Sequence, residues 1–120
     1  MRFTNKTVFI TGAAGGIGRQ TGLSFAKEGA NVAVSDLDFD MASRVAKEIK
    51  SAGGNAEPFK LDVTNQNETI ENMKNAYEHF GSLDIAFCNA GIREIVSPLE
   101  LSIEEWRKVI DINVTGVFIT

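Results

Sequence analysis

Residues 11–18 read TGAAGGIG, a turn with four glycines, of which those at positions 12, 16 and 18 give the spacing T-G-x-x-x-G-x-G. The turn follows the apolar run TVFIT at residues 7–11 and opens a stretch with helical spacing of apolar residues. Gly12 lets the chain turn sharply as it leaves a strand, Gly16 lets a phosphate approach the main chain, and Gly18 lets the helix pack closely on the strand. The N-terminus of that helix offers free N–H groups and a positive dipole end to an anion. The pattern therefore predicts a strand, a phosphate-binding turn and a helix.

A glycine-rich turn that binds no ligand is the alternative interpretation. The spacing T-G-x-x-x-G-x-G also differs from the commoner G-x-G-x-x-G, because Thr21 stands where the third glycine would fall. An acidic residue at a suitable distance favours the ligand-binding interpretation. Asp36 lies 18 residues after Gly18, just beyond a second apolar run. A carboxylate at that place can accept hydrogen bonds from the hydroxyls of an adenosine ribose.

Asp36 also indicates which dinucleotide is bound. Its carboxylate would repel a 2′-phosphate, whereas NADP calls for a cation near that phosphate. The next residue is Leu37 and position 13 is Ala, so neither place offers an arginine or a lysine. We therefore predict NAD as the cofactor. The alternative is that Asp36 caps the following helix, although Asp38 or Asp40 can do so instead.

The rest of the chain alternates short β-like runs with amphipathic stretches, which is typical of βαβ units and a parallel sheet. Strands are predicted at residues 7–11, 31–35, 56–61 and 83–88, and Pro58 favours a position near the sheet edge for the third. We expect an α/β, Rossmann-type, doubly wound parallel sheet that is incomplete. It would hold about four strands in the order 3-2-1-4, with helices on both faces.

Four helices are predicted between and after these strands. The first spans residues 16–28 and the second residues 39–52. The third ends at Gly81 and is expected to place Tyr77 in the core. The fourth begins at Ser102, whose capping-box partner is Glu105. Its predicted apolar face carries Trp106, Val109, Ile110 and Ile112.

The composition is that of an ordinary globular domain, with 43% hydrophobic and 23% charged residues among 120. The net charge of −4 and the scattered basic residues argue against a protein that binds nucleic-acid phosphates. Neither Cys88, the single cysteine, nor His79 has neighbours at metal-ligand spacing, so we predict no metal site. The apolar run at residues 8–10 is far too short for a signal peptide or a membrane span, and a cytoplasmic protein is expected.

Four motifs, in register along all 120 residues, resemble the short-chain dehydrogenase/reductase family. They are the turn at residues 11–18, Asp62-Val63, Asn89-Ala90-Gly91-Ile92 and Asp111-Ile112-Asn113-Val114. The resemblance is to the branch that includes 3-oxoacyl-acyl-carrier-protein reductases and many sugar, steroid and cyclic-alcohol dehydrogenases. It implies an oxidoreductase that interconverts an alcohol and a carbonyl by hydride transfer with a nicotinamide dinucleotide.

The resemblance also implies roles for individual residues. Asp62 and Val63 would flank the adenine, with the Asp62 carboxylate near the amino group of the ring. Asn113 would be catalytic and would hold a water molecule in the proton relay. The residues implied to bind the cofactor are Thr11, Gly12, Gly16, Ile17, Gly18, Asp36, Leu37, Asp62, Val63, Asn89, Ala90 and Gly91. The alternatives are that Asp62 caps the helix near Asn65, that Asn89 is a turn residue, and that Asn113 only kinks a helix beside Gly116.

The catalytic Ser, Tyr and Lys of the family have no counterparts in these residues. Tyr77 is the single tyrosine and position 81 is Gly, so no Tyr-x-x-x-Lys occurs. We expect those three residues beyond Thr120, and residues 1–120 to be the N-terminal part of a dinucleotide-binding Rossmann domain that is inactive by itself. The fourth strand would then present an open edge, and the isolated piece is expected to be poorly soluble or molten.

Three functions follow from these observations. The first is an NAD-dependent oxidoreductase that acts on a small-molecule alcohol or ketone, with no nucleic-acid or membrane partner. By analogy with the family, the complete enzyme would be a homodimer or a homotetramer. The second is a dinucleotide-binding module without catalysis. The third is a methyltransferase, which also has a glycine-rich turn and an acid after the second strand, but the segments around Asn89 and Asn113 count against it.

Overall fold

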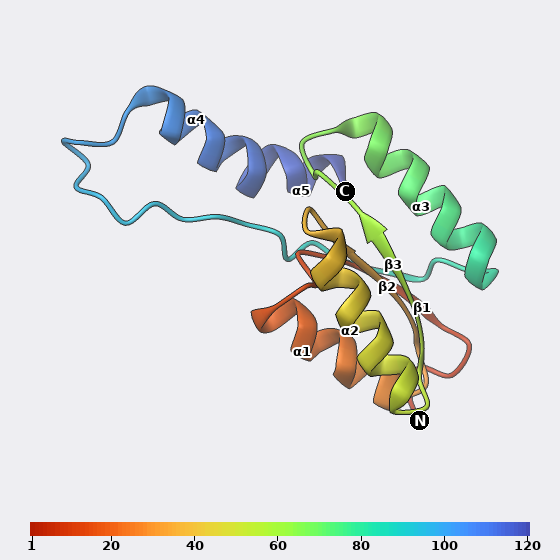
Figure 1. Cartoon of the computed structure of the whole chain (residues 1–120). Helices are drawn as coiled ribbons and strands as arrows, with labels where there is room; N and C mark the ends of the chain where they lie inside the picture. The colour runs from red at the N-terminus through yellow and green to blue at the C-terminus, as the bar shows by residue number, and fades with distance from the viewer.

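A parallel sheet with helices on both faces forms the body of the protein in the computed structural model, which describes residues 1–120 (Figure 1). All neighbouring strands pair in parallel, in the order β3-β2-β1-β4. The predicted fold class and strand order are therefore confirmed, and Pro58 lies on an edge strand as expected. The strands are β1 (Thr7–Thr11), β2 (Asn31–Asp36), β3 (Asn55–Lys60) and β4 (Ile85–Phe87).

The helices begin and end close to the residues that their sequence signals predict. Asp38 caps α2, Asn65 caps α3, and Gly81 follows the last residue of α3. Ser102 and Glu105 form the predicted capping box at the start of α4. The elements are α1 (Gly16–Lys27), α2 (Phe39–Ser51), α3 (Gln66–Phe80), α4 (Ile103–Ile110), the π-helical segment η1 (Asp111–Thr115) and α5 (Gly116–Ile119).

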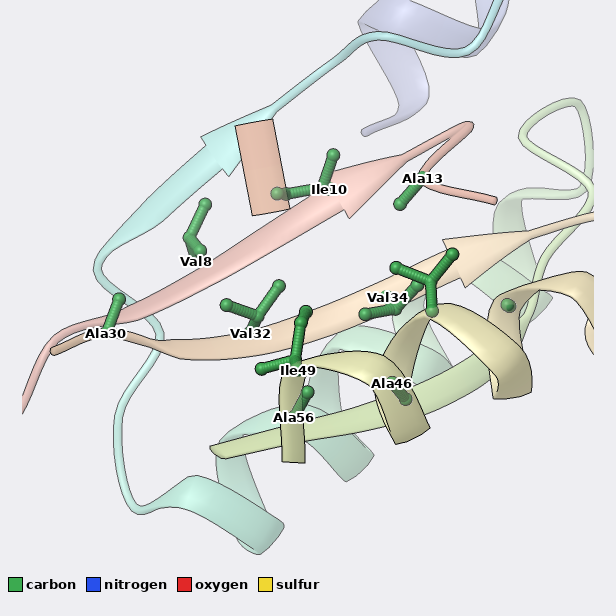
Figure 2. Close-up of a cluster of buried hydrophobic side chains, with 11 residues drawn as sticks. Val8, Ile10, Ala13, Ala30, Val32, Val34, Ala46, Ile49 and Ala56 are labelled. Carbon is green, nitrogen blue, oxygen red and sulfur yellow. The ribbon is translucent and has the colours of Figure 1, made fainter. Parts of the chain in front are cut away.

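The core has two layers, one on each face of the sheet. Every residue of β1 is buried, as expected for a central parallel strand. Alternate residues of β1 and β2 point to the same side, and Figure 2 shows Val8 and Val34 there with Ile49 of α2. On the opposite face Phe9 packs with Ala76 of α3. Hydrophobic burial on both faces therefore holds the first two strands rigidly beneath the glycine-rich turn.

The predicted core position of Tyr77 is wrong, because 56% of this residue is exposed. Helix α3 turns a different face to the sheet, formed by Thr69, Met73, Ala76 and Phe80. These positions are spaced by four, three and four residues, which keeps them on one side of an α-helix. The small Ala76 side chain, which is fully buried, lies where α3 meets the sheet.

Helix α4 is amphipathic as predicted, but its apolar face is open to solvent. It has no buried residue, and Trp106 and Ile110 are exposed. Together with η1 and α5 it forms a rod that extends away from the sheet (Figure 1). Ile112 and Gly116 are the points where this rod packs against the body. No helix of the chain is long and apolar enough to cross a lipid bilayer.

A polar network joins the N-terminal ends of β1 and β4. Asp84 accepts hydrogen bonds from the Lys6 ammonium, from the N–H of Thr7 and from the hydroxyl of Ser82, each at 2.8 Å. These donors, Lys6 first, lower the pKa of Asp84 from its ordinary 3.8 to about 2. The network ties Asp84, just before β4, to the first strand.

Because the pKa of Asp84 is lower in the folded than in the unfolded protein, its contribution to stability is complete above the unfolded pKa and disappears as the pH falls towards 2. We expect Asp84→Asn to lower the urea midpoint at pH 7 and to have a much smaller effect near pH 2. Urea titrations from pH 2 to 7 measure this difference, with Glu94→Gln in an exposed loop as the control. If the urea midpoints of the wild type and Asp84→Asn differ by the same amount at pH 7 and pH 2, the Asp84 charge does not stabilise the fold.

Candidate functional site

A cleft of about 430 Å³ opens at the carboxyl ends of the strands. In open α/β sheets this is the place where ligands bind, at the point where the strand order reverses. Here the reversal falls between β1 and β4, because β2 and β3 lie on the other side of β1. The cleft is lined by Gly12, Gly15, Ser35, Asp36, Leu37, Leu61, Asp62, Val63, Asn89, Ala90, Gly91, Ile92 and Ile112.

The glycine-rich turn is shaped by close backbone contacts. Gly12 has φ +62°, and a Cβ there would lie 2.8 Å from the Cα of Ala90. A Cβ on Gly18 would strike the carbonyl oxygen of Gly12 and would lie 2.6 Å from Nδ2 of Asn89. Larger residues at either position would therefore force the turn away from β4.

The front of the turn is open. A Cβ on Gly15 or Gly16 would meet no heavy atom within 4 Å, and Gly16 has φ +50°. Helix α1 has no side-chain cap and no acidic residue in its first turn, so its N-terminus keeps its positive character. These features fit the phosphates of a dinucleotide, which need room at the backbone and N–H donors.

Asn89 connects the end of β4 to the turn. Its Nδ2 donates to the carbonyl oxygens of Thr11 and Gly12 at 3.1 and 3.0 Å. The Thr11 hydroxyl oxygen accepts from the N–H groups of Asn89 and Ala90, both at 3.0 Å. Asn89 is therefore more than a local turn residue, since four hydrogen bonds couple it and Ala90 to the end of β1.

Asp36 lies at the end of β2 and lines the cleft. Its two carboxylate oxygens accept from the N–H groups of Ala14 and Asp38, each at 3.0 Å. The cap of α2 is Asp38, whose carboxylate accepts from the N–H of Met41 at 3.0 Å, so Asp36 is not needed for that purpose. Leu37 beside it is 65% exposed, and no lysine or arginine lines the cleft.

Asn113 lies in η1 and joins the rod to the loop after β4. Its Nδ2 donates to the carbonyl oxygen of Ile92, and its Oδ1 accepts from the N–H of Ile92, both at 2.8 Å. One turn further, Gly116 is buried so closely that a Cβ would lie 2.7 Å from Cγ2 of Val63. Asn113 itself does not line the cleft, although Ile92 and Ile112 do.

The cleft brings together eight of the twelve residues predicted to bind the cofactor: Gly12, Asp36, Leu37, Asp62, Val63, Asn89, Ala90 and Gly91. Of the other four, Thr11 and Gly18 are the first and last residues of the turn and lie against Asn89, Gly16 faces open space, and Ile17 is 73% exposed. Four further lining residues were not predicted to bind the cofactor: Gly15, Ser35, Leu61 and Ile112. Ser35 and Leu61 directly precede the two acids, a signal in the sequence, whereas Ile112 reaches the cleft only through tertiary packing.

No three side chains of the His, Cys, Asp or Glu type lie close enough to hold a metal ion. His79 is at the exposed end of α3, with Nε2 3.9 Å from a carboxylate oxygen of Glu57. Cys88 is half-buried just after β4.

A sequence model described as short chain dehydrogenase matches residues 6–120. The chain belongs to this family. Members of the short-chain dehydrogenase family bind NAD or NADP. This identity agrees with the cleft at the switch point of the sheet and with the order of the four motifs along the chain.

Several relatives resemble this chain. Cyclohexanol dehydrogenase from Acinetobacter sp. (strain SE19) is 43% identical over 118 residues, which are 98% of this chain and 47% of the relative. A 3-oxoacyl-acyl-carrier-protein reductase from Thermotoga maritima is 36% identical over 118 residues, which are 98% of this chain and 48% of the relative. A short-chain type dehydrogenase/reductase from Mycobacterium marinum superposes with a TM-score of 0.94 at 40% identity, covering 98% of this chain and 48% of that one. The chain spans about half the length of the curated relatives it matches.

Proposed function

We propose that the cleft binds NAD and that the whole protein oxidises a secondary alcohol to a ketone, or carries out the reverse reaction. The observation that supports NAD over NADP is the Asp36 carboxylate, which is held by two backbone N–H groups in a cleft without lysine or arginine. An oriented carboxylate accepts hydrogen bonds from the two ribose hydroxyls of NAD and repels the 2′-phosphate of NADP.

Each part of the cleft has a role in this proposal. The open backbone at Gly15 and Gly16 and the N-terminus of α1 hold the phosphates. Asp36 and Leu37 hold the adenosine ribose, and Asp62 and Val63 flank the adenine. The remaining predicted residues hold the turn against the end of β4: Thr11, Gly12, Gly18, Asn89, Ala90 and Gly91. Ile17 lies at the exposed start of α1.

Bound NAD supplies the carbon that takes the hydride from the alcohol. The residues of this chain bind and orient it rather than move the proton. Asn113 is the exception, since we propose that it holds a water molecule of the proton relay while its amide fixes Ile92. The two hydrogen bonds between Asn113 and Ile92 position the loop that continues from Gly91, and this loop borders the cleft where the alcohol would enter.

The proposed substrate is a secondary alcohol on a six-membered ring. Relatives from three bacterial genera carry names with such substrates, among them cyclohexanol dehydrogenase, cis-4-hydroxycyclohexanecarboxylate dehydrogenase and 2,5-dichloro-2,5-cyclohexadiene-1,4-diol dehydrogenase. The exposed apolar side chains Ile95 and Val96, in the loop after Ile92, suit an apolar ring.

The test uses the protein made from the whole reading frame that contains these residues. Cyclohexanol and NAD or NADP are supplied, and formation of the reduced nicotinamide is followed by absorbance. We expect turnover with NAD at a kcat/KM about 100-fold above that with NADP, the effect of losing charged hydrogen bonds to the ribose. Faster turnover with NADP would overturn the proposed cofactor. Binding of NAD without turnover of any ring alcohol would instead support a dinucleotide-binding module that has no catalytic activity.

We also propose that two or four copies of the whole protein assemble through the exposed face of α4. Trp106, Ile103 and Ile110 give this face large apolar side chains that are 52%, 54% and 37% exposed. Aromatic residues of this kind are enriched where protein surfaces associate. Sedimentation equilibrium of the wild type and of Trp106→Glu tests it, and we expect the variant to be a smaller species.

A further inference from the structure

Asp62 is held by residues that follow it in the chain. Its Oδ1 accepts from the hydroxyl of Thr64 at 2.7 Å and from the N–H of Thr64 at 3.0 Å. The N–H of Asp62 donates to Oε1 of Glu68 at 3.1 Å, and its carbonyl oxygen accepts from the N–H of Asn65 at 3.0 Å. Four hydrogen bonds therefore fix the backbone and one carboxylate oxygen of Asp62.

The other carboxylate oxygen, Oδ2, accepts no hydrogen bond within the protein. A carboxylate has about four acceptor sites, and Thr64 uses two of them on Oδ1. With Oδ1 fixed, the carboxyl group cannot rotate freely, and Oδ2 is left for a donor that enters the cleft. Asp62 lines that cleft together with Val63.

The helix cap does not explain these contacts. The N-terminus of α3 is capped by Asn65, whose Oδ1 accepts from the N–H of Glu68 at 3.1 Å. In a capping box the Glu68 side chain would return to the N–H of Asn65, but it bonds to the N–H of Asp62 instead. Glu68 is thus used to hold the segment that carries the acid.

We propose that Thr64 and Glu68 are positioning residues that aim Oδ2 of Asp62 at the amino group of the adenine, an inference that rests on the proposed NAD site. Neither residue lines the cleft, so both act through Asp62. The adenine amino group offers two N–H donors, and an ionised acceptor held in place distinguishes it from an analogue without that donor. The pair makes the site selective for adenine as the base.

The experiment compares NAD with nicotinamide hypoxanthine dinucleotide, in which a carbonyl oxygen replaces the adenine amino group. Dissociation constants are measured by calorimetry on the protein from the whole reading frame. We expect the wild type to prefer NAD about tenfold, the effect of one hydrogen bond to a charged group. In Thr64→Val this preference should fall to about twofold through weaker binding of NAD alone, and Thr64→Ser should restore it.

Glu68→Ala is the second variant, and we expect it to reduce the same preference without changing affinity for the hypoxanthine analogue. Its matched control is Glu71→Ala, which removes an exposed glutamate from the same helix. An equal loss of affinity for both dinucleotides in Thr64→Val and Glu68→Ala would show a merely structural role and overturn the proposal. A wild type that does not discriminate between the two would overturn it as well. If the wild type binds neither dinucleotide, the proposed cofactor site itself fails.

Discussion

The double variant Asp36→Ala/Leu37→Arg is expected to bind NAD about 100-fold more weakly than the wild type and NADP at least about tenfold more tightly. The loss arises because the ribose hydroxyls lose an ionised acceptor that the N–H groups of Ala14 and Asp38 hold in place. The gain arises because the repulsive carboxylate is removed and an arginine can pair with the 2′-phosphate through two parallel hydrogen bonds. Leu37 lines the cleft and is 65% exposed, so a longer side chain fits there without repacking the core.

The measurement is the dissociation constant of each dinucleotide, with thermal unfolding to confirm that the fold is retained. Asp40→Ala/Met41→Arg is the matched control, since it makes the same change of charge at exposed positions of α2 outside the cleft. We expect the control to leave the ratio of the two constants unchanged. A cofactor preference that moves equally in both double variants would mean that net charge, and not the position of Asp36, decides the selectivity.

Gly18→Ala is expected to lower the free energy of unfolding by about 3 kcal/mol and to abolish measurable NAD binding. The added methyl group would strike the carbonyl oxygen of Gly12 and lie 2.6 Å from Nδ2 of Asn89. Neither atom can move aside easily, because the same Asn89 nitrogen donates to the carbonyl oxygens of both Thr11 and Gly12. The strain therefore passes directly from α1 to the turn and to the end of β4.

Gly22→Ala provides a control of opposite sign on the same helix. A Cβ at Gly22 would contact Val32, Ile10 and Ile49 at 3.5 to 3.8 Å, which are ordinary van der Waals distances. Alanine is also the better helix former, so we expect Gly22→Ala to raise the free energy of unfolding by about 1 kcal/mol. Urea titrations of the two variants and the wild type measure both effects. Equal destabilisation by the two substitutions would mean that loss of glycine, and not contact with the turn, is responsible.

Much of the fold is encoded in local patterns that the sequence displays directly. The four strands, the helix after the glycine-rich turn and the caps at Asn65 and Ser102 depend on neighbours a few residues away. The order of strands follows from the right-handed connections of βαβ units. The same local patterns place Asp36 at the last residue of β2 and Asp62 just beyond β3, and the carboxyl ends of parallel strands meet at one edge of the sheet.

Other features depend on contacts between distant segments and were not predictable from local spacing. Tyr77 and Ala76 are adjacent in α3, yet only the packing of the helix against Phe9 buries Ala76 and leaves Tyr77 in solvent. Ile112 lines the cleft because its side chain packs against the buried cluster that contains Leu61 and Val63.

Taken by itself, the sequence determined the fold class, the strand order, the family and the residues of the glycine-rich turn, because each depends on chain-local geometry or on motifs in register. Tertiary structure alone decided which backbone groups hold the polar side chains of the candidate site in place. Asn89 reaches Thr11 across 78 positions, Asn113 reaches Ile92 across 21, and Asp36 receives the N–H of Ala14 across 22. Hydrogen bonds of this kind depend on the packing of the hydrophobic helix faces against the sheet, since that packing brings the partners within reach.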